Sequence, residues 1–332
     1  MLNNKTILIT GGTGSFGKAF VTYLFQNFPR VKKVVIFSRD EQKQHQMANE
    51  FSPKEYPIKY LLGDVRDMQR VHEVTRNVDI IIHAAAMKHV PASELNPMEC
   101  VKTNILGSQN IISAAIANGV SQVVALSTDK AASPINAYGA SKLLLEKLFV
   151  HADIEKGEQD IKFSVVRYGN IFGSKGSVVP FFLQKYKEGF LPLTSEKMTR
   201  FSITIQESID LVLFALNNGW GGEVIVPIAP SYRLTDVAKA IAPDVEHRIV
   251  GIRKGEKLHE VMLTEHESYD AVKREGYYII CPSDGSWSRD EYCKETGAEL
   301  VEEGFEYQSG MNDRWLSLED IQRLIRTEHI MD

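Results

Sequence analysis

Short apolar segments rich in valine and isoleucine recur along the first half of the chain, and they restrict the possible folds strongly. They read TILIT, KVVIF, IKYLL, VDIIIHAAA, QVVALST and FSVVRYGN, at residues 6–10, 33–37, 58–62, 78–86, 122–128 and 163–170. Polar loops or stretches with helical spacing separate them. Continuous apolar strands that alternate with helices are typical of a parallel sheet covered on both faces. The first half is therefore predicted to form a doubly wound, Rossmann-type α/β domain.

The pattern loosens after about residue 175, where apolar runs become sparse and charged stretches more frequent. A chain of 332 residues also exceeds one average domain. We predict a Rossmann domain at residues 1–175, which also receives part of residues 200–230, and a smaller α/β substrate lobe formed mainly by residues 176–332. The segment GEVIVPI, residues 222–228, is a candidate for one further strand.

Composition excludes several classes of protein. With 43% hydrophobic residues and a net charge of −5, the chain is globular and has no general basic field for nucleic acid or anionic lipid. Cys100, Cys281 and Cys293 are few and lack metal-ligand spacing, which predicts a reduced compartment, no disulfide framework and no metal site. The start lacks signal-peptide features and no apolar run reaches the length of a membrane span, so we expect a cytoplasmic protein.

A glycine-rich segment, GGTGSFG, connects the first apolar run to a stretch with helical spacing. Gly11, Gly14 and Gly17 would allow a tight turn, a close approach of the backbone to a pyrophosphate, and close packing of the following helix. This is a dinucleotide-binding pattern. We expect the cofactor to contact Gly11, Thr13, Gly14, Ser15, Phe16, Gly17, Ser38, Arg39, Lys43, Asp64, Val65, Ala84, Ala85, Ala86, Asn104, Tyr138 and Lys142.

The end of the second apolar run bears on the identity of that cofactor. An enzyme that uses NAD usually places an acidic residue there for the ribose hydroxyls, whereas this chain has Ser38 and Arg39. A hydroxyl and a guanidinium suit a 2′-phosphate, so NADP is favoured. Asp40 follows directly and keeps NAD as the alternative. Asp64 after the third run is a candidate acceptor for the adenine amino group.

The segment STDKAASPINAYGASK, residues 127–142, concentrates reactive side chains. Thr128, Asp129 and Lys130 follow a predicted strand at the carboxyl edge of the sheet, where ligands of open α/β folds bind. Tyr138 and Lys142 are one turn apart on a predicted helix. A lysine ammonium near the phenol would lower the pKa of Tyr138, so that it could take a proton from an alcohol during hydride transfer.

These motifs resemble the extended short-chain dehydrogenase/reductase family, through the three glycines, Asn104 in KTNILGSQN, and Tyr138 with Lys142. More narrowly, STDKAASPINAYGASK, RYGNIFGSKGSVVPFF, MTRF and IRKGEKLHE resemble the inverting UDP-N-acetylglucosamine 4,6-dehydratases that begin pseudaminic acid synthesis. The resemblance covers the whole chain. It departs from the usual RPGEKLHE at Lys254, which replaces proline and makes that loop less rigid.

The resemblance implies oxidation of C4 of a UDP-sugar, loss of water across C5 and C6, return of hydride to C6, and inversion at C5. On this basis we expect Asp129 to act as the acid for the departing hydroxyl and Lys130 as the base at C5. Lys130 would then need a pKa lowered by burial and by neighbouring positive charge. The resemblance also implies a dimer or hexamer. Its expected substrate contacts are Lys88, Asn170, Arg200, Arg253 and Glu256.

Two other functions fit parts of the pattern. A UDP-sugar 4-epimerase would share the fold, the cofactor and the pair Tyr138 and Lys142, but it needs no acid and base pair at Asp129 and Lys130. A non-catalytic regulator that senses NADP could also use this fold, since folds do not determine functions. Such a regulator has no need of the tyrosine and the lysine, and both are present here.

Overall fold

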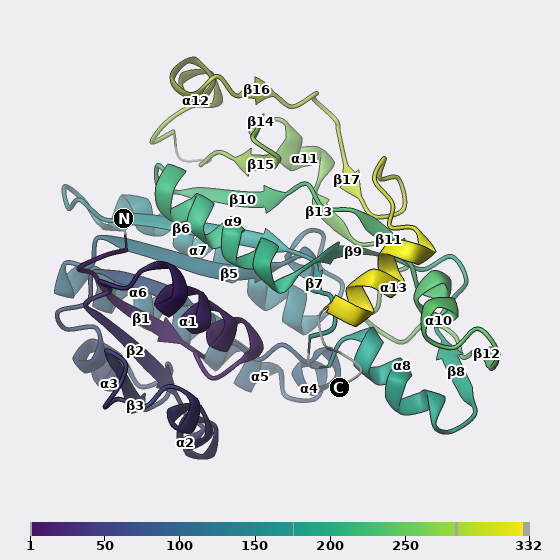
Figure 1. Ribbon diagram of the computed structural model, residues 1–332. Helices are drawn as coiled ribbons and strands as arrows, with labels where there is room; N and C mark the ends of the chain where they lie inside the picture. Colours follow the sequence, from purple (N-terminus) through teal and green to yellow (C-terminus); the bar gives the residue numbers. More distant parts are fainter. Residues whose placement is uncertain (1, 175, 283–284, 328–332) are drawn as a thin grey trace.

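The structure is a computed structural model that describes residues 2–174, 176–282 and 285–327. A 10-stranded sheet, in the order β16-β14-β15-β10-β6-β5-β4-β1-β2-β3, forms its centre (Figure 1). Its strands are β1 (Thr6–Thr10), β2 (Lys33–Ser38), β3 (Ile58–Leu62), β4 (Ile80–His83), β5 (Gln122–Thr128), β6 (Lys162–Tyr168), β10 (Glu223–Pro227), β14 (Ala271–Arg274), β15 (Tyr277–Ile280) and β16 (Glu299–Leu300).

The predicted fold class is confirmed. Strands β1, β3 and β5 have the bounds of the apolar runs TILIT, IKYLL and QVVALST, and the run GEVIVPI contains β10. Neighbours from β3 to β10 pair in parallel, and the register sets Thr10 beside both Phe37 and His83. Strands β15, β14 and β16 then extend the sheet in antiparallel pairing.

Helices cover both faces of the large sheet, which explains why its strands are apolar throughout. Buried side chains of α1 (Ser15–Asn27), α2 (Glu41–Glu50), α9 (Ile205–Asn218) and α12 (Arg289–Thr296) belong to one core cluster. Those of α3 (Met68–Val74), α6 (Gly107–Asn118) and α7 (Ala137–Glu155) belong to the other. Before α6 the chain forms α4 (Val90–Leu95), α5 (Pro97–Cys100) and the π-helix η1 (Val101–Leu106).

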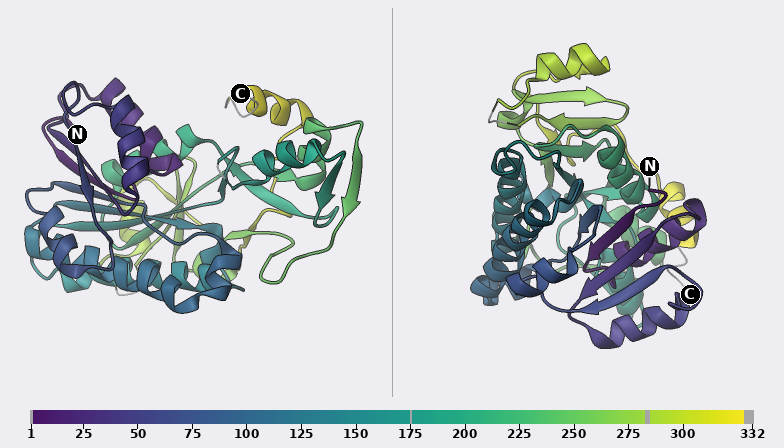
Figure 2. Two further views of the ribbon diagram at one scale, coloured as in Figure 1. Left: turned by 90° about the horizontal axis from the view of Figure 1, so that it is seen from below. Right: turned by 90° about the vertical axis from the view of Figure 1, so that its left-hand side faces the viewer.

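A smaller lobe lies beside the large sheet, and Figures 1 and 2 show it grouped around α8 and α10. Strand β7 follows β6 after one residue, so the lobe begins at the carboxyl edge of the large sheet. The lobe and the segments that join it to the sheet contain β7 (Asn170–Ile171), α8 (Val178–Tyr186), β8 (Phe190–Leu193), β9 (Thr199–Ile203), β11 (Ser231–Arg233), α10 (Leu234–Ile241), β12 (Glu246–Ile249), β13 (Val261–Leu263), α11 (Glu265–Ser268), β17 (Tyr307–Gln308) and α13 (Leu318–Thr327).

The lobe has a core of its own, built from Phe172, Phe182, Leu193, Tyr232 and Ile321 with their neighbours. The predicted division into residues 1–175 and 176–332 stays a prediction, and its boundary at 175 lies outside the described residues. The sheet itself takes β10, β14, β15 and β16 from the second half of the chain. Of the described helices, none combines the length and the apolar character that a membrane span needs.

Candidate active site

The glycine-rich turn after β1 lies against the segment that follows β4. Gly11 has a φ of +64°, and a Cβ atom added there would come within 2.9 Å of the Ala85 backbone. A Cβ at Gly17 would lie 2.3 Å from the Gly12 carbonyl oxygen. Side chains at Gly11 and Gly17 are therefore excluded by backbone contacts, and Ala84 and Ala85 are brought next to the turn.

Helix α1 begins directly after this turn, with Gly14 as its N-cap. Gly14 supplies no side-chain cap, so the first N–H groups of α1 remain available for an anion. Thr13 is half-buried and Ser15 is exposed at this end of the helix. Phe16 is buried in the core and stacks on Phe20 at 5.6 Å between ring centroids, which leaves its backbone as the part that faces the turn.

The residues after β2 are those on which the choice between NADP and NAD was based. The carboxylate of Asp40 accepts the Lys43 N–H at 2.9 Å as the N-cap of α2 and pairs with the Lys43 ammonium at 2.8 Å. Asp40 is therefore engaged by its own helix. Arg39 is exposed and lies 3.4 Å from Asp64, while the Ser38 hydroxyl accepts a hydrogen bond from Gln44.

Asp64 and Val65 lie where β3 leads toward α3. Burial raises the pKa of Asp64, but hydrogen bonds from Arg66 and the charges of Arg39 and Arg66 outweigh it, and the net shift is downward. The Val65 side chain is buried and packs against Gly107. The Asp64 carboxylate accepts hydrogen bonds from the Arg66 guanidinium at 2.6 and 2.8 Å.

Asn104 links the segment after β4 to α7 and is fully buried. Its carbonyl oxygen accepts the Met87 N–H at 2.8 Å, and its amide donates to the Met87 carbonyl at 2.9 Å and to the Ser141 hydroxyl at 2.9 Å. This contact fixes the backbone that follows Ala86 relative to Tyr138 on α7. In the structure Asn104 therefore aligns the two segments whose residues Ala84–Ala86 and Tyr138 were predicted to contact the cofactor.

Thr128, Asp129 and Lys130 lie at the carboxyl edge of the sheet, as their place after β5 indicated. Asp129 is fully buried, and its Oδ1 accepts hydrogen bonds from the Thr128 hydroxyl at 2.8 Å and from Lys130 Nζ at 2.9 Å. The other carboxylate oxygen of Asp129 has no partner in the part of the chain that the structure describes. A buried carboxylate oxygen without a partner is costly and marks a place where a ligand or a proton belongs.

Helix α7 presents Tyr138 and Lys142 to the same region, and both are buried. Its N-cap Asn136 accepts the Gly139 N–H at 2.7 Å. Gly139, which the sequence analysis did not select, allows the close approach: a Cβ there would lie 2.2 Å from the Lys130 carbonyl oxygen. Its position between Tyr138 and Lys142 was the available signal.

The expected electrostatics of Tyr138 are wrong for the chain alone. Lys142 Nζ donates to the Leu126 carbonyl at 2.7 Å, and its pKa is lowered to about 8, mainly by burial. Burial raises the pKa of Tyr138 to about 12, against the opposing charge of Lys130 and a hydrogen bond with Thr128. The positive charge that opposes the rise in the pKa of Tyr138 is therefore that of Lys130.

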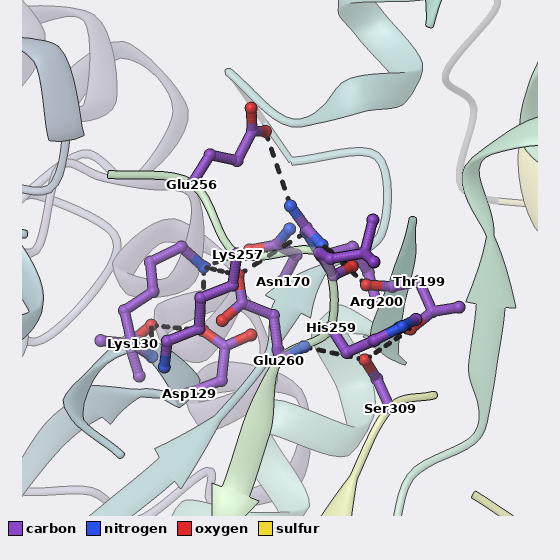
Figure 3. A network of polar contacts seen from close by, with 12 residues as sticks. Asp129, Lys130, Asn170, Thr199, Arg200, Glu256, Lys257, His259, Glu260 and Ser309 are labelled. Carbon is purple, nitrogen blue, oxygen red and sulfur yellow. Dashed lines mark hydrogen bonds and ion pairs between the residues drawn. The ribbon is translucent and has the colours of Figure 1, made fainter. Parts of the chain in front are cut away.

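The expected fall in the pKa of Lys130 is also wrong for the chain alone. Burial lowers this pKa, but Asp129 and Glu260 outweigh burial, and the net shift is upward. Glu260 is 2% exposed, and its Oε1 lies 3.6 Å from Lys130 Nζ and 3.6 Å from Arg200 Nε (Figure 3). Glu260 is the last residue of the motif IRKGEKLHE and was not predicted as a site residue, because only Arg253 and Glu256 of this motif matched expected substrate contacts.

The predicted substrate residues are brought partly together. Arg200, 7% exposed in its side chain, lies 3.5 Å from Glu256, and Asn170 Oδ1 accepts a hydrogen bond from Lys130 Nζ at 3.4 Å (Figure 3). Arg253 is exposed, with its guanidinium 6.0 Å from the centroid of the Phe181 ring. Burial lowers the pKa of Lys88 in the segment after β4.

The loop that carries Arg253 and Glu256 is attached to the turn that carries Asp129 and Lys130. Lys257 Nζ donates to the Ala132 carbonyl at 2.6 Å, and Asn136 Nδ2 donates to the Gly255 carbonyl at 2.8 Å. These two bonds join residues that are more than a hundred positions apart in the sequence, so local pattern could not predict them. The loop and the turn therefore form one wall of the site.

Comparisons with known proteins agree with this arrangement. The family described as polysaccharide biosynthesis protein matches residues 7–282. The chain belongs to this family. An inverting UDP-N-acetylglucosamine 4,6-dehydratase from Campylobacter jejuni subsp. jejuni serotype O:2 is 46% identical, with 98% of each chain covered. The predicted resemblance to these dehydratases is thereby confirmed.

One further sequence relative and one solved structure also match nearly the whole chain. A UDP-glucose 4-epimerase from Rickettsia akari is 40% identical over 98% of this chain and 97% of its own. The crystal structure of Pen from Bacillus thuringiensis superposes with a TM-score of 0.89 at 35% identity, with 99% of each chain covered. The whole chain, including the lobe, thus follows a known architecture.

Proposed function

We propose that the protein is a UDP-N-acetylglucosamine 4,6-dehydratase that inverts C5 and makes UDP-2-acetamido-2,6-dideoxy-β-L-arabino-hex-4-ulose. The pair formed by the buried Asp129 and the half-buried Lys130 beside Tyr138 carries this proposal, because elimination of water needs an acid and a base in addition to the tyrosine. The inverting dehydratase of 46% identity supports the same activity. We further propose that this is the first step of pseudaminic acid synthesis.

The residues at the glycine turn fit a dinucleotide. Gly14 leaves room at an uncapped helix N-terminus, and the nearest atom to an added Cβ is 3.3 Å away. A nicotinamide cofactor held there would supply the acceptor for the hydride from C4 and its donor for C6. We propose NADP, with Arg39 and Ser38 at the 2′-phosphate, since Asp40 is engaged by Lys43.

The other residues that were predicted to contact the cofactor, the first of which is Gly11 and the last Lys142, complete the proposed cofactor site. Tyr138 takes the proton of the C4 hydroxyl. Asp129 and Lys130 share one dissociable proton across 2.9 Å, and its transfer from the ammonium to the carboxylate yields a neutral amine and a carboxylic acid. The amine can then remove the proton at C5, and the acid can protonate the departing C6 hydroxyl.

Arg200, Arg253, Asn170, Glu256 and Lys88 are the proposed contacts for the UDP-sugar. Arg200 is held by carbonyl oxygens of Thr199 at 2.7 Å and Leu258 at 3.2 Å, which leaves its charge directed at the loop with Glu256. A diphosphate would take the place of Glu256 at this guanidinium, because two charged phosphates compete well with one half-buried carboxylate. Location in the cytoplasm and assembly into a dimer or hexamer stay predictions.

Proton NMR in heavy water tests the proposed reaction. The purified protein is incubated with UDP-N-acetylglucosamine and NADP, and the C6 signal and the couplings at C5 are followed. A new methyl signal with deuterium at C5 and L-arabino geometry is the expected result. Appearance of a C4 epimer alone would contradict the proposal and favour a UDP-sugar 4-epimerase. This is the second candidate function, because the relative from Rickettsia akari is named as a UDP-glucose 4-epimerase.

Binding of NADP and NAD to Arg39→Ala tests the cofactor. The dissociation constant for NADP should rise about tenfold or more, because a charge-assisted contact to phosphate is lost. The dissociation constant for NAD should stay nearly unchanged. An equal effect on both would remove Arg39 from the 2′-phosphate site.

A further inference from the structure

Glu260 occupies an unusual position in the site. It precedes β13 in the part of the chain that leads back from the lobe, yet one carboxylate oxygen lies 3.6 Å from Lys130 Nζ and 3.6 Å from Arg200 Nε. The other oxygen, Oε2, is buried and has no hydrogen-bond partner among the described residues. A carboxylate with 2% exposure is retained only where opposite charges compensate its desolvation.

The backbone of Glu260 is fixed from the C-terminal part of the chain. Its N–H donates to the Ser309 hydroxyl at 2.9 Å, and the Ser309 N–H donates to the Glu260 carbonyl at 2.8 Å. Ser309 in turn contacts the Thr199 hydroxyl at 2.7 Å, next to Arg200. The carboxylate is therefore placed by a rigid set of contacts and is not a mobile surface group.

We propose that Glu260 is a positioning residue of the dehydration, which holds the Lys130 ammonium and the Arg200 guanidinium side by side. This inference rests on the proposed function, because Lys130 is the proposed proton-transfer group and Arg200 a proposed diphosphate contact. The Lys130 ammonium and the Arg200 guanidinium, which both lie 3.6 Å from the same oxygen of Glu260, would repel each other, and Glu260 and Asp129 supply compensating negative charges. Glu260 thus links the place where the substrate is bound to the place where it reacts.

The charged and titratable groups around Lys130 determine how the pKa of Lys130 would change if the Glu260 charge were removed. They are Asp129 from the turn after β5, Tyr138 from α7, Arg200 from β9, Tyr232 from β11, and Lys257 and Glu260 from the loop before β13. Asp129 and Glu260 raise the pKa of Lys130, whereas Arg200 lowers it. Loss of the Glu260 charge therefore shifts the Lys130 titration to lower pH, whichever protonation state the reaction needs.

NMR of the full chain labelled with ¹³C at the lysine ε carbon measures this titration without any turnover. Lys130→Arg assigns the Lys130 signal by its absence. In the wild type this signal should keep its ammonium position at pH 10.5, where an ordinary lysine is about half titrated. In Glu260→Gln its midpoint should fall by about one pH unit or more. A wild-type midpoint at or below that of ordinary lysines would overturn the proposal without the need for any variant.

Two further variants separate charge from shape. Glu260→Asp keeps the charge, and its Lys130 midpoint should lie between those of the wild type and Glu260→Gln. Glu256→Gln removes a carboxylate that contacts Arg200 and not Lys130, so it should move the midpoint less than Glu260→Gln does. Equal shifts in Glu256→Gln and Glu260→Gln would show a general field effect and overturn the proposal.

Turnover then tests the role in the reaction. In Glu260→Gln we expect the limb of the pH profile that Lys130 controls to move to lower pH by the shift seen in the NMR titration, and KM for the UDP-sugar to rise because Arg200 loses its anchor. An unchanged profile with a shifted titration would overturn the role in the reaction. If the NMR shift is found but no variant and no wild type dehydrates the sugar, the proposed function fails and the charge arrangement stands.

Discussion

At the scale of single residues, burial and charge act in opposite directions on the groups of the site. Burial raises the pKa of Tyr138 to about 12, whereas two carboxylates raise that of Lys130 against its burial. A phenol with this pKa holds its proton at neutral pH. A positive charge brought next to the ring, such as an oxidised nicotinamide, would lower the pKa toward the working range.

Replacing Tyr138 by phenylalanine tests its role as the group that takes the C4 proton. We expect kcat for dehydration to fall by about 100-fold to 10,000-fold, the range that general acid–base groups contribute. The midpoint of thermal unfolding should change little, because the ring stays and only the hydroxyl is lost. Residual activity close to that of the wild type would show that another group takes this proton.

At the scale of elements, His83 at the end of β4 joins three parts of the fold. Its ring contacts the Thr10 hydroxyl of β1 at 2.8 Å and the Ser108 hydroxyl of α6 at 3.1 Å. Thr10 in turn accepts the Ala85 N–H at 3.2 Å, next to the glycine turn. Burial lowers the pKa of His83 to about 3, so the ring is neutral in the folded chain.

His83→Gln is predicted to change how stability depends on pH. Because the folded pKa of His83 is about 3 and the unfolded one about 6.5, the unfolded chain binds an extra proton between these values. This histidine therefore costs stability as pH falls below about 6.5, with a slope of about 1.4 kcal/mol per pH unit. Urea unfolding from pH 7 to pH 4 should show a shallower loss in His83→Gln, and parallel curves would refute the neutral buried ring.

Gly139→Ala is predicted to separate α7 from the turn that holds Lys130. An added Cβ would lie 2.2 Å from the Lys130 carbonyl oxygen, so the helix must move. Overpacking of this kind typically costs about 1–3 kcal/mol, and we expect kcat to fall as well since Tyr138 moves with the helix. Ala140→Ser, at an exposed position of α7, is the control and should alter neither the free energy of unfolding nor kcat appreciably.

Elements with local signals were predictable, and contacts between distant segments were not. The strands that position the glycine turn and Asp129 follow from continuous apolar runs, and Tyr138 follows from helical spacing. Glu260 and Lys257 could not be placed, because their partners Lys130 and Ala132 come from another part of the chain. The pKa shift of Tyr138 was misjudged because burial, which raises it, outweighs the nearby positive charge, and that of Lys130 because the charges of Asp129 and Glu260 outweigh its burial.

At the scale of the whole molecule, Arg167 joins the large sheet to the segments on either side of it. It is 1% exposed on β6 and pairs with Glu146 of α7 at 2.6 Å and with Glu267 of α11 at 2.7 Å. It also donates to the Met262 carbonyl on β13 at 2.9 Å. This network therefore fixes β13 and α11, the segments that directly follow Glu260, to the large sheet.

Arg167→Met is predicted to destabilise the protein by about 3–5 kcal/mol, because it leaves the buried Glu146 and the half-buried Glu267 without their cation. Urea unfolding measures this loss. Arg248→Met is the matched control, since Arg248 pairs with Glu246 on the surface and both side chains are more than half exposed. Its loss should be below about 1 kcal/mol. Similar losses in both variants would contradict a structural role for the buried network.

The path of the chain through the large sheet has a consequence for how such proteins diversify. After β6 the chain leaves the sheet, returns as β10, leaves again, and returns as β14, β15 and, after α12, β16. The lobe is thus made of two excursions from the sheet and of the segment that follows β16, and all of them are connected to the same sheet. Substitutions or insertions in these excursions can alter which sugar is accepted while the hydride and proton chemistry at β5 stays in place. Relatives that match nearly the whole chain and are named as a 4,6-dehydratase and as a 4-epimerase are what such an inheritance would produce.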